Sequence, residues 1–143
     1  MINFFDKLEV LYSSLRLEEK VKSGLISLKK KYKLFIISSN RESMIKSYFT
    51  NSESSLLFTE ILGYNTHKSK VEKFKLILSN YHLLPSEVIF VTDTVGDVLE
   101  AKEVGVKAIA VTYGFHAQEH LQKANPEYFA SSFDEVLKIL NNY

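Results

Sequence analysis

Two short, uninterrupted apolar runs place the strongest limit on how this chain can fold. Residues 34–37 (LFII) stop at the polar triplet Ser38-Ser39-Asn40, and residues 88–91 (VIFV) stop at Thr92-Asp93-Thr94. Continuous apolar runs of this length are typical of strands that are buried on both faces, as in parallel sheets covered by helices. Both strands end in hydroxyl, amide or carboxylate groups, which the sheet interior would not accommodate.

Segments with helical periodicity separate these strands. Residues 21–28, 41–49, 70–81, 95–104 and 133–140 are expected helices, and residues 56–62 and 106–111 are expected strands. Alternating strands and helices predict an α/β fold, a three-layer Rossmann-like parallel sheet with helices on both faces. Ligands bind such sheets at the carboxyl ends of the strands, so the polar clusters mark the expected site.

Composition excludes several other classes of protein. Lysine plus arginine number 18 against 17 acidic residues, so a basic face for nucleic acid is not expected. The chain has no cysteine and no apolar run long enough to span a membrane, and its first residues lack a signal-peptide pattern. We therefore expect a cytoplasmic protein without nucleic-acid or membrane partners.

Asp93 and Asp97 are the first candidate metal ligands. Asp93 ends a strand and Asp97 lies four residues later, in the first turn of the next helix. Two carboxylates that converge at such a corner suit a hard divalent cation, directly or through water. The alternative is that Asp97 only favours the positive end of the helix dipole and that Asp93 is an ordinary loop residue.

Ser38, Ser39 and the lysines near residue 70 are candidate phosphate ligands. A hydroxyl and free backbone N–H groups at a strand end can bind a phosphoryl oxygen, although one serine there could simply cap the following helix. Lys70 opens a helix that Ser69 and Glu72 delimit as a capping box, and Lys68 competes with Lys70 for any functional role.

These elements occur in an order that resembles the haloacid dehalogenase superfamily. The segment KLFIISSN resembles its second motif, HKSKVEKFKLIL its third and VIFVTDTVGDVLEAKEVGVKAIAVTYG its fourth. The trailing YGFH and ANPEYFASSFDEVL resemble the phosphoglycolate-phosphatase-like branch. The resemblance extends from Val21 to the end of the chain, and it implies a Rossmann-like core over residues 18–143.

The resemblance also implies a division of roles. Ser38 would bind the transferring phosphoryl group, with Ser39 and Asn40 beside it, and Lys70 (or Lys68) would neutralise its charge. Asp93 would be a Mg²⁺ ligand, and Asp97 would support the metal directly or through another group. The implied substrate is a small phosphorylated metabolite.

The family's nucleophile motif, Asp-x-Asp, does not occur in this sequence. Asp6 can be laid over the first aspartate of the motif, but Leu8 then replaces the acid/base. The helical spacing of Phe4, Leu8, Leu11 and Leu15 favours another interpretation, in which residues 1–17 are the last helix of the family's cap domain. The central strand that carries the motif would then be missing, and the core would be incomplete, with a gap between the strands that precede Ser38 and Asp93.

Three functions therefore remain open. The chain could be a phosphatase that is inactive alone, a phosphate- or metal-binding regulatory module, or a chain completed by a partner or by a second copy. A phospho-acceptor receiver domain has its acids first, its hydroxyl next and its lysine last, which is not the order found here.

His116 and His120 have the spacing of a metal pair, but the sequence offers no third ligand, so surface histidines are expected.

Overall fold

Strands and helices alternate along the computed structural model, which describes residues 17–51 and 56–143. The elements are α1 (Glu19–Lys29), β1 (Phe35–Ile37), α2 (Glu42–Asn51), β2 (Glu60–Leu62), α3 (Lys70–Asn80), the 3-10 turn η2 (Pro85–Glu87), β3 (Ile89–Thr92), α4 (Val95–Glu103), β4 (Lys107–Val111), α5 (Gln118–Leu121), η3 (Gln122–Ala124), β5 (Tyr128–Ala130) and α6 (Phe133–Asn141). The predicted α/β fold is confirmed.

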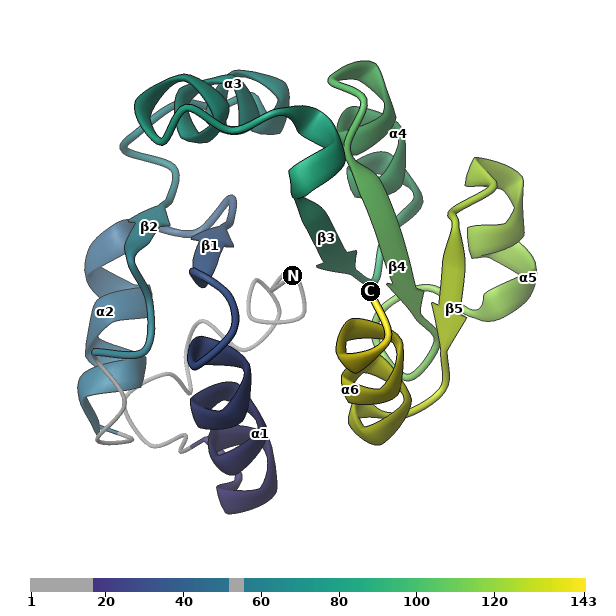
Figure 1. Cartoon of the computed structure of the whole chain (residues 1–143). Helices are drawn as coiled ribbons and strands as arrows, with labels where there is room; N and C mark the ends of the chain where they lie inside the picture. The colour runs from purple at the N-terminus through teal and green to yellow at the C-terminus, as the bar shows by residue number, and fades with distance from the viewer. Residues whose placement is uncertain (1–16, 52–55) are drawn as a thin grey trace.

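Every strand pairing in the described part of the chain is parallel. β1 pairs with β2, and β3, β4 and β5 form a second sheet in that order. Figure 1 shows these two groups of strands, with α2 beside the first and α4, α5 and α6 around the second. Among the residues that the structure describes, no backbone pairing joins β1 to β3, and the predicted loss of a central strand between them stays a prediction.

Three helices begin at hydroxyl caps that their sequences supply. The side chains of Ser69, Thr94 and Ser132 accept hydrogen bonds from the backbone N–H groups of Glu72, Asp97 and Glu135, respectively. Such caps satisfy backbone donors that have no partner within the helix. They fix the starting points of α3 and α4, and both helices carry candidate site residues in their first turn.

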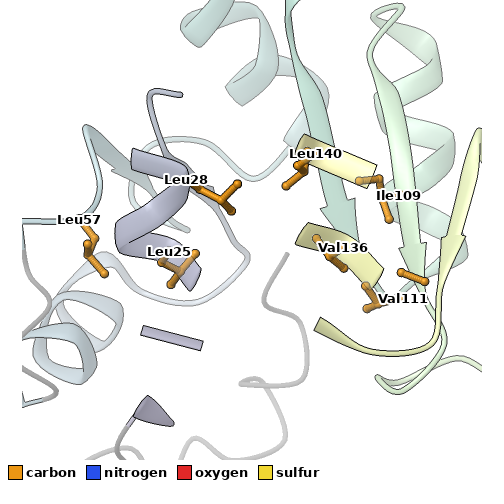
Figure 2. Close-up of a cluster of buried hydrophobic side chains, with 8 residues drawn as sticks. Leu25, Leu28, Leu57, Ile109, Val111, Val136 and Leu140 are labelled. Atoms are coloured by element: carbon orange, nitrogen blue, oxygen red, sulfur yellow. The ribbon is translucent and has the colours of Figure 1, made fainter. Parts of the chain in front are cut away.

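A buried apolar cluster connects the two ends of the described chain. It consists of Leu25, Leu28, Leu57, Ile109, Val111, Ala130, Val136 and Leu140. Figure 2 shows the side chains of α1 on one side and those of β4 and α6 on the other. Gly24 permits the close approach of α1 and α6, because a Cβ atom there would lie 2.5 Å from Cε1 of Phe133.

The structure corrects several details of the sequence analysis. The expected strand at residues 56–62 is shorter, beginning at Glu60, and β5 was not predicted. Asp6 and the expected cap helix, apart from Leu17, lie outside the described residues, so the division at residue 17 stays a prediction. No helix in the described ranges is long and apolar enough to cross a membrane.

Candidate active site

The first turns of α3 contact the segments that follow β1 and β3. Ser38 follows β1 and is completely buried, while Asp93 follows β3 and is 1% exposed. Lys70 and Lys73, on successive turns of α3, are also buried, and each contacts a residue that follows one of the two strands. The structure therefore brings together groups from three parts of the chain that are far apart in the sequence: the end of β1, the start of α3 and the turn between β3 and α4.

Lys70 forms a buried ion pair with Asp97. The lysine Nζ donates to Oδ1 of Asp97 at 2.5 Å, and the hydroxyl of Thr92 donates to Oδ2 at 2.6 Å. Burial raises the pKa of Asp97, but the Lys70 ammonium and these hydrogen bonds contribute to a net pKa below the ordinary value. Asp97 is therefore a carboxylate with both oxygens engaged.

Glu100 fastens the N-terminus of α3 to α4. Its Oε2 accepts a hydrogen bond from the backbone N–H of Lys70 at 2.9 Å. A carboxylate is favourable beside the positive end of a helix dipole, where a lysine side chain is not. Glu100 and Asp97, one helical turn apart on α4, thus hold the backbone and the side chain of Lys70.

Lys73 is a site residue that the sequence analysis missed. It is fully buried and donates from Nζ to the backbone carbonyl of Ser38 at 2.7 Å. Burial and the nearby Lys70 ammonium lower its pKa to about 8, against the opposing influence of Glu100, Glu42 and Asp97. The sequence contains a signal for it, since residues 70, 73, 74 and 77 form a single helical stripe that buries Phe74 and Ile77.

The residues of the turn after β1 differ in burial and in hydrogen bonding. The Ser38 hydroxyl oxygen accepts a hydrogen bond from the backbone N–H of Asn40 at 3.1 Å, and Asn40 is buried as well. Ser39 is exposed. Lys68 is exposed in the loop before α3, so Lys70, rather than Lys68, lies at the carboxyl ends of the strands.

Asp93 is held by the segment that follows β4. Its Oδ2 accepts from the backbone N–H of Phe115 at 2.8 Å, and its backbone carbonyl accepts from His116 N–H at 3.1 Å. Its other carboxylate oxygen, Oδ1, is buried and has no hydrogen-bond partner among the described residues. A buried oxygen of this kind is suited to bind a cation or a protonated group.

The histidines are not arranged as a metal site. His116 Nδ1 accepts from the backbone N–H of Val95 at 3.0 Å, and its ring makes an edge contact with His120. Within residues 17–51 and 56–143, no group of three or more His, Cys, Asp or Glu side chains is placed to hold a metal. A cation at Asp93 would therefore take its further ligands from water, substrate or residues outside the described ranges.

Comparisons with known proteins agree with this architecture. The family model described as haloacid dehalogenase-like hydrolase matches residues 3–111. The chain is similar to a phosphoglycolate phosphatase of Pasteurella multocida (strain Pm70), with 27% identity over 137 residues, 93% of this chain and 58% of the relative. It therefore spans less than two thirds of that relative's length.

Solved structures show the same fold. A haloacid dehalogenase-like family hydrolase from Streptococcus pneumoniae superposes with a TM-score of 0.79 at 29% identity, over 87% of this chain and 60% of that one. A protein from Haemophilus somnus 129pt, described as a predicted phosphoglycolate phosphatase, gives 0.78 at 25% identity, over 87% and 57%.

Proposed function

The chain belongs to the haloacid dehalogenase-like hydrolase family, and from that premise we propose that it forms the phosphate- and Mg²⁺-binding part of a phosphohydrolase of small phosphorylated metabolites. One observation carries the proposal. Two buried lysines and two buried aspartates converge with Ser38 where β1 and β3 end. Phosphoryl transfer depends mainly on positioning and on charge neutralisation, and these residue types supply both.

Ser38 and Lys70 would bind the phosphoryl group. The Ser38 oxygen accepts from Asn40 N–H, an arrangement that leaves the serine O–H to donate to a phosphoryl oxygen. Lys70 would supply positive charge from a position fixed by Asp97 and Glu100. Ser39, exposed beside Ser38, would contact the phosphoryl group only from the solvent side.

The residues present fit a magnesium ion. Asp93 Oδ1 offers a buried oxygen without a partner among the described residues, whereas both oxygens of Asp97 are engaged by Lys70 and Thr92. Mg²⁺ is commonly held by one or two carboxylates together with water and substrate phosphate. When bound, it would neutralise phosphoryl charge. Asp93 would be its direct ligand, and Asp97 would support the site through Lys70 and Thr92.

The attacking carboxylate is the part that these residues do not supply. The sequence has no Asp-x-Asp, and Asp6 lies outside the described residues. Because the described residues place no such nucleophile at the site, we expect the 143-residue chain to bind phosphate and Mg²⁺ but to hydrolyse no ester. The second candidate, a binding or regulatory module, or a chain completed by a partner carrying the motif, rests on the same absence.

Hydrolysis of p-nitrophenyl phosphate with Mg²⁺ tests the proposal, alongside Mg²⁺ binding measured by calorimetry. We expect cation binding that Asp93→Asn abolishes and no turnover by the chain alone. Asp134→Asn is the matched control, since Asp134 is an exposed carboxylate that pairs with Lys20. Turnover that Asp6→Asn removes would identify Asp6 as the nucleophile, and unchanged Mg²⁺ binding in Asp93→Asn would refute the metal assignment.

A further inference from the structure

Residues 114–116, between β4 and α5, hold Asp93 at three points. Phe115 N–H donates to the side-chain oxygen Oδ2, and His116 N–H donates to the backbone carbonyl. Gly114 lies against the side chain, because a Cβ atom at this position would be 2.4 Å from the Asp93 Cβ and 2.6 Å from Oδ2. The segment thus contacts the backbone and the carboxylate of a single residue.

These contacts place the two carboxylate oxygens of Asp93 in different environments. Oδ2 is fixed by a backbone donor, whereas Oδ1 has no partner in the described part of the chain, although the side chain is buried. A carboxylate held by one oxygen cannot rotate freely, so the other oxygen keeps a fixed direction. Preorganisation of this kind is how groups around a metal ligand raise its affinity for the cation.

His116 connects this segment to α4. Its Nδ1 accepts from the backbone N–H of Val95, the first residue of α4. Because Nδ1 is an acceptor here, the neutral ring carries its proton on Nε2. One histidine therefore joins Asp93, through its backbone N–H, to the first turn of the helix that carries Asp97.

We propose that residues 114–116 are a positioning element for Asp93, in which His116 locks the segment to α4 so that Oδ1 is presented to the divalent cation. The proposal rests on the proposed function for the identity of the ligand, and it assigns His116 a role distinct from metal ligation. In this proposal His116 is a positioning residue, which acts through Asp93 and Val95 rather than as a ligand of the cation.

Two measurements on the full chain test this role. Mn²⁺ binding is measured by electron paramagnetic resonance, and the exchange rates of the Val95 and Phe115 amide protons are measured by NMR without metal. We expect His116→Leu to weaken Mn²⁺ binding about tenfold, as is usual when a partner of a metal ligand is lost. The same variant should accelerate exchange at both amides. His116→Asn keeps an acceptor at the Nδ1 position and should restore both properties.

His120→Leu is the matched control, since it removes a neighbouring imidazole that contacts the His116 ring, while the His116 groups that bind Asp93 and Val95 stay in place. We expect His120→Leu to change neither Mn²⁺ binding nor the exchange of the Val95 and Phe115 amides. Mn²⁺ binding lost equally in His120→Leu and His116→Asn would show imidazole ligation and overturn the proposal, as would unchanged amide exchange in His116→Leu. If the wild-type chain binds no Mn²⁺, the metal function itself fails, while the amide rates still decide whether His116 holds the segment.

Discussion

The ammonium group of Lys70 lies 2.5 Å from a carboxylate oxygen of Asp97, and each side chain is at most 5% exposed. An ion pair this deeply buried constrains the site more than it stabilises the fold, because removal of both ions from water offsets much of their attraction. The pair fixes Lys70 in one direction, and its loss has consequences that can be measured.

Replacement of one partner should be strongly destabilising. Lys70→Met leaves the Asp97 carboxylate buried without its cationic partner, and we expect the free energy of unfolding to fall by about 3–5 kcal/mol. Urea denaturation measures the change. The double variant Lys70→Met/Asp97→Asn should lose less than the sum of the two single variants. Lys20→Met removes an exposed ion pair and should change the free energy of unfolding little. An equal loss of stability in Lys20→Met and Lys70→Met would show that burial of the Lys70–Asp97 pair does not set the cost.

Lys73 should make stability depend on pH in the alkaline range. Its pKa of about 8 in the folded chain lies below the ordinary value of 10.5, so between these limits the unfolded chain binds more protons. The free energy of unfolding should therefore rise by about 3 kcal/mol through this group as the pH rises from 8 to 10.5. Below pH 8, where Lys73 is charged in both states, the cost of burying its ammonium group should be fully present.

Comparison with Lys73→Met isolates that contribution from other titrating groups. Urea denaturation at intervals from pH 7 to 10, with a chelator present, should give a steeper rise in wild type than in the variant. Lys75→Met is the control, because Lys75 is exposed on the same helix and pairs with Glu72. Parallel curves for wild type and Lys73→Met would show that Lys73 has an ordinary pKa.

Gly114→Ala should displace Asp93. The new Cβ would overlap the Asp93 side chain, and neither backbone nor carboxylate can yield without loss of the Phe115 hydrogen bond. We expect Mn²⁺ affinity to fall about tenfold or more. Gly96→Ala in α4 is the matched control, since a Cβ there meets nothing within 4 Å. Equal affinities of the two variants would mean that the segment does not position Asp93.

Gly24→Ala should weaken the contact between α1 and α6. A Cβ at position 24 would lie 2.5 Å from the Phe133 ring, and overpacking of this kind costs about 1–3 kcal/mol. Thermal unfolding should show a lower midpoint, and Phe133→Leu in the same chain should recover part of the loss. No recovery would place the strain elsewhere than at Phe133.

The sequence predicted the elements of the fold better than the details of the site. Alternation of apolar runs and helical stripes identified most strands and helices, because burial on both faces leaves a continuous apolar run. β5, only three residues long, gave too short a pattern. Ser38, Lys70 and Asp93 lay at strand ends or helix starts and were visible, although their proposed roles stay predictions.

Lys73 and residues 114–116 were missed for different physical reasons. Lys73 lies on the buried stripe of α3, but a lysine in an amphipathic helix is normally interpreted as solvent-facing. Phe115 and His116 contact Asp93 chiefly through backbone N–H groups, which every residue other than proline possesses. A hydrogen bond from a backbone N–H group cannot be predicted from the residue type, and only the tertiary structure shows it.

The packing of α1 against α6 has a consequence for synthesis on the ribosome. Lys20 and Asp134 form an ion pair across 114 positions of sequence, and Leu25 and Leu28 share a cluster with Val136 and Leu140. The apolar face of α1 therefore emerges long before its partner does. We expect nascent chains that stop short of α6 to expose this face to chaperones, and native protection of α1 to arise only after α6 has been released.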